Sequence, residues 1–207
     1  YISNEATLST LASTLPNCYV FSDELNHSSM IQGIRASGAK KVIFKHNDVK
    51  DLQNKIKELD KDTPKIIAFE SVYSMDGDIA PIENIAEVAK NFNALTYLDE
   101  VHAVGMYGNR GGGISQELGI SNQIDIIEGT LAKAYGVMGG YITGNKYLVD
   151  IVRSFASGFI FTTSIPPTIA AGAIESVKHL KNSNIERTKQ KDAVKELKKK
   201  LMETDIP

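Results

Sequence analysis

The 207-residue sequence is poor in several residue types, and each scarcity narrows its function. It has no tryptophan and one cysteine, Cys18, which excludes a disulfide within the chain and suits a reducing compartment. The net charge of −2 at pH 7 lacks a basic excess, so we expect no nucleic-acid partner. No apolar run is long enough to span a membrane, so we expect no membrane partner either. With 42% hydrophobic residues, the chain can still bury a sizeable core.

Apolar segments of strand type alternate with segments of helical periodicity along most of the chain. This alternation predicts a three-layer α/β/α fold with a mostly parallel, seven-stranded sheet. Strands are expected at Cys18–Phe21, Lys41–Phe44, Lys65–Phe69, Leu95–Leu98, Ile124–Ile127, Gly140–Thr143 and Phe159–Phe161. Helices are expected at Asn4–Leu11, Met30–Ala36, Val49–Leu59, Ile82–Asn91, Lys146–Ala156 and after Pro166, with Asp48 and Pro81 as helix starts. The lysine-rich stretch 189–200 is predicted to be a solvated helix face.

Lys133 lies on the turn after the expected strand Ile124–Ile127, among glycines and small residues. Burying an ammonium group is costly unless its pKa falls or the amine reacts. The small neighbours leave room for a flat molecule, so a Schiff base with an aldehyde cofactor fits this setting. Thr130, one helical turn earlier, would place a hydroxyl on the same side. On this segment alone, a solvated surface lysine is an equal alternative.

Other expected strands also end in polar side chains. Asp99 ends a buried strand, where a carboxylate would keep a pyridine nitrogen protonated, and His102 follows within reach of a phenolic oxygen. His27 follows the first strand, and its imidazole can lie flat against an aromatic ring. The segment 69–77 follows the third strand and adds a hydroxyl and a turn glycine to the same cleft.

Structural roles are the alternative for these residues. Asp99 can cap the segment after it, with His102 as an ordinary loop histidine. Asn26 or Ser28 can cap a helix, with His27 incidental to it. No spacing typical of a metal site is present, so we expect no metal.

Taken together, six motifs in order resemble the α-oxoamine synthase family of pyridoxal-phosphate enzymes, which condense an amino acid with an acyl-CoA. The motifs are Ser22-Asp23-Glu24-Leu25-Asn26-His27, His46-Asn47-Asp48, Ser74-Met75-Asp76-Gly77, Asp99-Glu100-Val101-His102-Ala103-Val104-Gly105, Gly129-Thr130-Leu131-Ala132-Lys133 and Gly158-Phe159-Ile160-Phe161-Thr162-Thr163-Ser164. The resemblance implies the PLP-dependent transferase fold of type I, pyridoxal 5'-phosphate (PLP) as cofactor, and a homodimer with its active site at the subunit interface. Segments 99–102, 106–108 and 158–164 resemble most closely the members that condense glycine with succinyl-CoA at the start of tetrapyrrole (haem) synthesis. Glycine C-acetyltransferase and 8-amino-7-oxononanoate synthase are the alternatives within the family.

The resemblance also implies roles for individual residues. Lys133 would form the Schiff base and later move the glycine Cα proton, Asp99 would bind the pyridine nitrogen, and His102 the phenolic oxygen. His27 would stack on the ring. The remaining positions would hold the cofactor (Ser74 and Thr130), reach the cofactor phosphate of the neighbouring subunit (Thr162 and Thr163) or contact the acyl-CoA (Ser22 and Lys41).

Members of this family are about twice as long as this chain. We therefore expect residues 1–180 to form the PLP-binding large domain, incomplete at its N-terminus, and residues 181–207 to lead toward a small C-terminal domain that is absent. We expect the 207 residues by themselves to be catalytically inactive. The alternatives to an active full-length enzyme are a catalytically inactive, cofactor-binding fragment and a non-PLP α/β protein with an incidental lysine. The expected location is the cytoplasm in a bacterium, or the mitochondrial matrix in a eukaryote.

Overall fold

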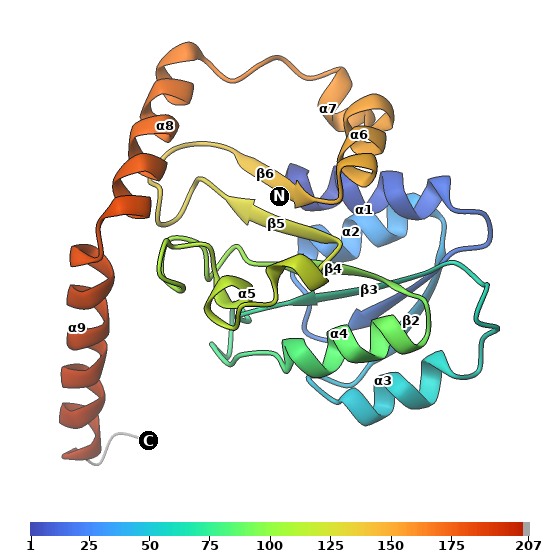
Figure 1. The fold of residues 1–207 in the computed structure, drawn as a ribbon, viewed down its shortest axis with the longest axis horizontal. Coiled ribbons are helices and arrows are strands. Elements are labelled where there is room, and N and C mark those ends of the chain that lie inside the picture. Colours follow the sequence, from blue (N-terminus) through green and yellow to red (C-terminus); the bar gives the residue numbers. More distant parts are fainter. Residues whose placement is uncertain (205–207) are drawn as a thin grey trace.

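A six-stranded sheet lies at the centre of the computed structural model, which describes residues 1–204 (Figure 1). The strands are β1 (Tyr19–Asp23), β2 (Lys40–Phe44), β3 (Lys65–Glu70), β4 (Leu95–Asp99), β5 (Ile126–Thr130) and β6 (Gly140–Gly144). Their order is β2-β1-β3-β4-β5-β6, with β1 to β5 parallel and β6 antiparallel at one edge. The chain passes from β2 to the other side of β1, so the carboxyl ends of β1 and β3 form a topological switch point. Open α/β sheets bind their ligands at such a point.

Helices cover both faces of the sheet (Figure 1). One face is covered by α1 (Ile2–Thr14), α2 (Ser28–Ser37) and α6 (Lys146–Phe155), and the other by α3 (Val49–Ile56), α4 (Ile82–Asn91) and the short α5 (Ile114–Glu117). Because alternate residues of a strand point to opposite faces, Ile66 and Ala68 of β3 join one core and Ile67 and Phe69 the other. The predicted three-layer α/β/α class is confirmed.

Local sequence signals set several helix ends. Asp48 caps α3 and accepts a hydrogen bond from the Asp51 amide at 2.9 Å, and Pro81 directly precedes α4. At the end of α2, Gly38 takes a left-handed conformation with φ of 69°. Both predicted helix starts are confirmed, and the bounds of α4 match the prediction.

The seventh predicted strand is not part of the sheet. Phe159 and Ile160 lie in the short helix α7 (Ser157–Ile160), where both amides donate to the Ala156 carbonyl at 2.9 Å. Phe159 is 56% exposed and has no neighbouring strand in the described part of the chain. A run of three apolar residues is too short for its periodicity to separate a strand from one turn of helix.

Two further helices, α8 (Pro167–Asn182) and α9 (Ile185–Met202), form a column beside the sheet (Figure 1). Arg187 of α9 ties this column together, donating to the Leu180 carbonyl at 2.7 Å and to the Asn109 carbonyl at 3.2 Å. The lysines of α9 are exposed, as predicted. Within residues 1–204, no helix has both the length and the apolar character needed to cross a membrane.

Candidate active site

The loops after β1, β3, β4 and β5 meet at the carboxyl edge of the sheet and bring together four of the predicted site residues. His102 follows β4, and burial, together with the charges of Lys133 and His27, lowers its pKa. Asp99, the last residue of β4, acts in the opposite direction and raises that pKa. Glu70 links three of these residues: its Oε1 accepts from the His27 amide at 2.6 Å, its Oε2 lies 3.8 Å from His102 Nδ1, and it is in register with Asp99. Lys133 follows β5, the strand next to β4, so the four residues come from three strand ends at one edge of the sheet.

Three buried carboxyl groups lie side by side across this edge. Glu70 of β3 is in register with Asp99 of β4, and Asp99 is in register with Glu128 of β5. The three residues are 1%, 3% and 1% exposed, respectively, and we call them the carboxyl row. Burial, with the Asp99 charge adding to it, raises the pKa of both Glu70 and Glu128 to about 8.

Asp99 is the member of the row with the most hydrogen-bond donors. Its Oδ2 accepts from Asn4 Nδ2 at 2.7 Å, and its Oδ1 accepts from the Val101 amide at 2.8 Å. Asn4 is in turn oriented by the Tyr97 hydroxyl, which donates to Asn4 Oδ1 at 2.7 Å. Donors of this kind favour the charged form of a carboxyl group. Asp99 therefore closes the turn after β4, as the capping alternative supposed, and also presents a fixed negative charge.

His102 is half-buried beside Glu70. Burial, followed by the charge of Lys133, lowers the pKa of His102 and favours the neutral imidazole. His102 Nδ1 lies 3.8 Å from Glu70 Oε2 and has no hydrogen-bond partner within residues 1–204. A ligand with a polar atom at this position could therefore satisfy His102.

His27 is itself the cap of α2, in place of the two residues considered in the sequence. Its Nδ1 accepts from the Ser29 amide at 3.2 Å and lies 2.7 Å from Ser29 Oγ. Asn26 instead donates to Ser22 Oγ at 2.9 Å and to the Ala68 carbonyl at 2.8 Å, while Ser28 is the first helical residue. Capping fixes the imidazole, and its exposed ring remains available to a ligand.

Lys133 is exposed on the irregular segment 131–139 between β5 and β6. The expectation that Thr130 lies one helical turn before Lys133 is wrong, because β5 ends at Thr130 and no helix follows before Lys133. The Thr130 hydroxyl instead shapes the segment, accepting from the Ala132 amide at 3.1 Å and donating to the Gly139 carbonyl at 3.2 Å. Strand pairing between β5 and β6 keeps the segment short and tied at both ends.

A glycine on the loop after β4 supports the Lys133 segment. Gly105 has φ of 81°, and a Cβ there would lie 2.3 Å from the Ala134 Cβ. The loop after β4 is fixed by the buried Glu100, whose carboxylate accepts from the Ile114 and Ser115 amides at 3.0 and 2.8 Å. This close approach fixes the residue after Lys133 against the loop that carries His102.

The other predicted positions are not brought to this cluster by an observed contact. Ser74 is exposed on the turn after β3, and Thr162 and Thr163 are exposed on the connection between α7 and α8. Ser22 is buried and donates to the Asp23 carbonyl at 3.1 Å. Lys41 lies opposite Val20 on the edge strand β2, three strands away from β4.

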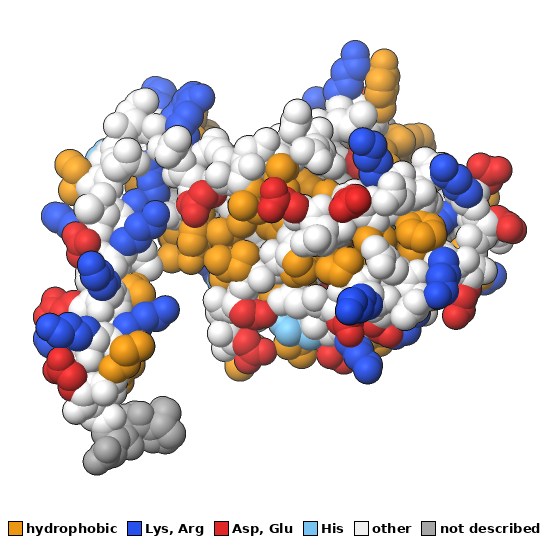
Figure 2. Space-filling view, turned by 60° about the horizontal axis from the view of Figure 1, so that its bottom comes forward, with side chains coloured by type: hydrophobic (Ala, Val, Ile, Leu, Met, Phe, Trp, Pro, Cys, Tyr) orange, Lys and Arg blue, Asp and Glu red, His pale blue; other side chains and the backbone are white. Residues whose placement is uncertain are grey.

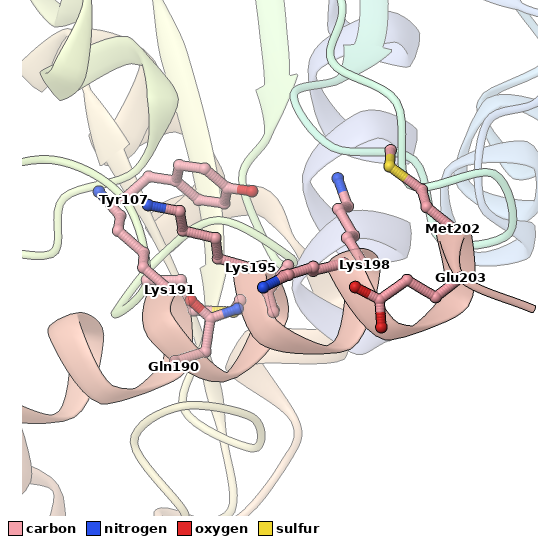
Figure 3. Close-up of a pocket in the computed structure, with 10 residues that line it drawn as sticks. Tyr107, Gln190, Lys191, Lys195, Lys198, Met202 and Glu203 are labelled. Carbon is pink, nitrogen blue, oxygen red and sulfur yellow. The ribbon is translucent and has the colours of Figure 1, made fainter.

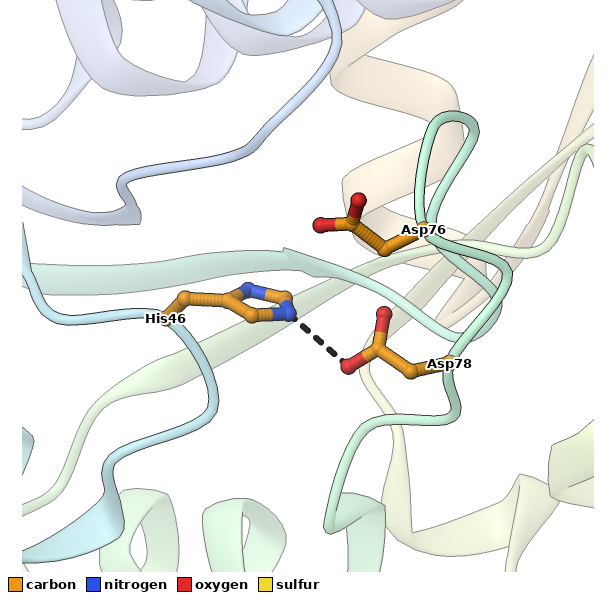
Figure 4. A group of neighbouring side chains, drawn as sticks. All are labelled: His46, Asp76 and Asp78. Atoms are coloured by element: carbon orange, nitrogen blue, oxygen red, sulfur yellow. Dashed lines mark hydrogen bonds and ion pairs between the residues drawn. The ribbon is translucent and has the colours of Figure 1, made fainter. Parts of the chain in front are cut away.

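A second polar cluster surrounds His46 at the end of β2 (Figure 4). His46 Nδ1 and Nε2 lie 2.9 Å from Asp23 Oδ1 and Asp78 Oδ2, respectively. Partial burial lowers the pKa of His46, but these two hydrogen bonds and the charges behind them raise it overall. Asp76 is close by, with possible ligand atoms of Asp76, Asp78 and His46 within 4.8 Å of one another. An imidazolium between two carboxylates offers no lone pair to a metal. This cluster is therefore best explained as two ion pairs, of His46 with Asp23 and with Asp78.

A groove with a volume of about 610 Å³ lies away from the carboxyl row (Figure 3). It runs between α9 and the loop after β4, and Figure 2 shows apolar side chains on the body of the molecule that faces this helix. Its lining includes Met106 and Tyr107 on one side and Lys191, Lys195 and Lys198 on the other. The lining residues include none of the predicted site residues.

Sequence reasoning missed Glu70, Glu128 and Asn4 as parts of the site. Glu128 carried a usable signal, because a glutamate within the otherwise apolar run Ile126–Gly129 of a buried strand requires a partner. Asn4 carried none, since it reaches Asp99 across 95 positions of sequence. The register of β3, β4 and β5, which aligns the three carboxyl groups, is likewise a property of the folded sheet.

Comparison with known proteins gives consistent results. The sequence matches the aminotransferase class I and II family over residues 1–207. The 5-aminolevulinate synthase of Rhizobium meliloti is 58% identical over 207 residues, and the mitochondrial 5-aminolevulinate synthase of Schizosaccharomyces pombe is 57% identical over 208. All of this chain is covered in both, but only 51% of the first protein and 37% of the second. The chain thus spans about half, or less, of the length of these relatives.

Solved structures show the same fold. A variant of serine palmitoyltransferase from S. paucimobilis, solved with a bound PLP–myriocin aldimine, superposes with a TM-score of 0.86 and 36% identity over 91% of this chain and 47% of its own. The 8-amino-7-oxononanoate synthase of Francisella tularensis gives a TM-score of 0.77 and 29% identity over 90% of this chain and 53% of its own. The full-length family match, the six-stranded sheet and these superpositions agree, and the chain belongs to the aminotransferase class I and II family.

Proposed function

We propose that this protein uses PLP to condense glycine with succinyl-CoA, giving 5-aminolevulinate, CoA and CO2. The observation that carries the proposal is the gathering of His27, Asp99, His102 and Lys133 at the carboxyl edge of the sheet. The choice of product is supported by relatives named 5-aminolevulinate synthase that are up to 58% identical. Glycine C-acetyltransferase and 8-amino-7-oxononanoate synthase remain the competing activities.

The residues fit PLP on chemical grounds. A pyridine ring needs an anion at its nitrogen, and Asp99 is a buried, firmly held carboxylate. The aldehyde of PLP needs an accessible amine, and Lys133 is exposed. The phenolic oxygen of PLP needs a hydrogen-bonding neighbour, and His102 Nδ1 has no hydrogen-bond partner among the described residues. When bound, the cofactor would supply an electron sink for the carbanion that forms at the glycine Cα.

Each residue would then have a distinct task. Asp99 holds a proton on the pyridine nitrogen through its fixed charge, and His27 covers one face of the ring with a capped, immobile imidazole. His102, kept neutral by burial and by the charge of Lys133, offers a hydrogen bond without adding a second cation. Lys133 takes the proton from the glycine Cα, and its position on a short tied segment limits its distance from that atom.

We propose further that two copies of this chain form a homodimer with the active site at the interface. Thr162 and Thr163 would bind the cofactor phosphate of the partner, while Ser74 and Thr130 would act within the same subunit. The exposure of both threonines, and of Phe159 and Phe161 beside them, supports this assignment. Residues 1–180 would form the cofactor-binding domain and residues 181–204 a helical connection, while residues 205–207 of the expected connection lie outside the described residues. The relatives leave two locations open, a bacterial cytoplasm and a mitochondrial matrix.

A cofactor titration tests the central assignment. Wild-type protein should develop the absorbance of a PLP Schiff base, and Lys133→Ala should lose it while keeping its circular dichroism spectrum, because the amine is the attachment point. Lys90→Ala, a change at an exposed lysine on α4, is the matched control and should behave as wild type. An unchanged Schiff-base band in Lys133→Ala would contradict the assignment of Lys133.

Substrate competition assays on the full-length protein separate the candidate activities. With glycine present, succinyl-CoA should be consumed in preference to other acyl-CoA thioesters, and the product should be 5-aminolevulinate. Preference for acetyl-CoA would instead indicate a glycine C-acetyltransferase. The fold alone does not distinguish between them, because one fold supports all three reactions.

A further inference from the structure

The carboxyl row contains a buried acid with no task in the proposed chemistry. Glu128 lies directly beside Asp99 in the β4–β5 register and is 1% exposed. Its Oε1 accepts a hydrogen bond from the Ser3 hydroxyl of α1. Its Oε2 is buried and has no partner among the donors within residues 1–204. An unpartnered carboxylate oxygen at this depth would be costly, but a protonated oxygen needs an acceptor instead of a donor.

That acceptor is the neighbouring carboxylate. Two adjacent buried carboxyl groups cannot both ionise easily, so one of them keeps a proton. Asp99 has donors at both of its oxygens, from Asn4 and from Val101, whereas Glu128 has only the Ser3 hydroxyl. The charge therefore belongs on Asp99 and the proton on Glu128.

We propose that Glu128 is a neutral carboxylic acid at neutral pH that donates a hydrogen bond to Asp99 and acts as a positioning residue for it. Glu128 thus holds Asp99 from the β5 side while Asn4 holds it from α1. Asp99 can then present its single negative charge without repulsion from the neighbouring acid. Consequences for cofactor binding rest on the proposed function, but the protonation of Glu128 does not.

Some of the groups around Glu128 raise the pKa of its carboxyl group and others lower it. Burial is the main cause that raises its pKa to about 8, and the negative charge of the adjacent Asp99 adds to it. From α1, the hydrogen bond from the Ser3 hydroxyl lowers it. The neighbouring phenols, Tyr97 on β4 and Tyr141 on β6, themselves have raised pKa values and carry no charge that could offset it.

This protonation gives stability a definite pH dependence. The unfolded chain releases the Glu128 proton near the ordinary pKa of 4.5, whereas the folded protein keeps it until about pH 8. Between these values the folded state binds more protons, so stability falls as pH rises through this window. Glu128→Gln keeps a donor toward Asp99 and an acceptor for Ser3 but cannot ionise. Its melting temperature should equal that of wild type near pH 4.5 and exceed it increasingly up to pH 8.

Two measurements without cofactor decide the protonation. The infrared difference spectrum of wild type minus Glu128→Gln should show a protonated carboxyl band at pH 7 that disappears above about pH 8. Glu58→Gln, a change at an exposed glutamate, is the control and should show neither this band nor a pH-dependent change in melting temperature. A carboxylate band alone at pH 7, or a melting-temperature difference that does not change with pH, would overturn the proposal.

Cofactor titration then tests the positioning role. Glu128→Gln should bind PLP within about twofold of wild type, whereas Glu128→Ala should bind at least about tenfold more weakly, the scale of a lost hydrogen bond to a charged group. Equal weakening in both variants would overturn the positioning role. If wild type itself failed to bind PLP, the proposed function would be wrong, and the infrared and melting results would still decide the state of Glu128.

Discussion

At the scale of single residues, the side chains at the carboxyl edge of the sheet have structural duties as well as their proposed chemical ones. His27 caps α2, Asp99 closes the turn after β4, and Thr130 closes the segment that carries Lys133. These bonds remove rotational freedom before any ligand arrives, which reduces the entropy cost of binding. Alanine substitutions here would therefore mix a loss of fold with a loss of function. Conservative substitutions are the more informative tests.

Asp99 offers such a comparison. Asp99→Ala removes the charge beside the proposed pyridine nitrogen and should lower kcat/KM by about a hundredfold or more, as for other lost electrostatic contacts. Asp99→Glu keeps the charge but displaces it from Asn4 and should retain more activity than Asp99→Ala. Steady-state kinetics of the full-length protein with glycine and succinyl-CoA measure both. Equal activity in wild type and Asp99→Ala would show that this carboxylate serves only as a cap.

At the scale of secondary-structure elements, two loops must fit closely for Lys133 to be placed. Gly105→Ala should destabilise the protein by about 1–3 kcal/mol, since it adds a Cβ at a positive φ and against Ala134. Gly38→Ala is the matched control, because Gly38 has a similar φ of 69° but no atom within 4 Å of the added Cβ. Denaturant unfolding measures the difference between the two variants. PLP affinity should fall only in Gly105→Ala, and a fall in both would show that backbone strain alone is responsible.

Sequence signals of short range predicted the elements well, whereas their mutual alignment was not predictable. The buried strands, the Asp48 cap and the Pro81 helix start each depend on residues that are close in the sequence. All three appear in the structure. The carboxyl row depends on strand register, and the bond from Asn4 to Asp99 depends on how α1 packs over the sheet. Such features arise from packing between distant segments. The sequence therefore located Asp99 but did not reveal the two acids beside it.

At the scale of the whole molecule, the region around α6, α7 and α8 exposes an unusual amount of apolar surface. Phe155, Phe159 and Phe161 are 69%, 56% and 85% exposed, respectively. Exposed aromatic residues in such number are typical of a surface that contacts another protein. Thr162 and Thr163 follow directly in the chain, so a partner that covers the phenylalanines would also meet the threonines. This continuity links the proposed dimer to the proposed shared site.

A mixing experiment tests whether two subunits share each site. Lys133→Ala lacks the Schiff-base amine, and the double variant Thr162→Ala, Thr163→Ala lacks the proposed phosphate contacts, so each alone should bind little PLP at a limiting concentration. In a mixed dimer, one of the two sites combines the intact Lys133 of one chain with the intact threonines of the other. Random mixing should therefore restore about a quarter of the wild-type Schiff-base absorbance, because about half of the dimers are mixed and each has one complete site. Sedimentation should show dimers throughout. If mixing restored no absorbance while dimers formed, Thr162 and Thr163 would act within their own subunit or not at all.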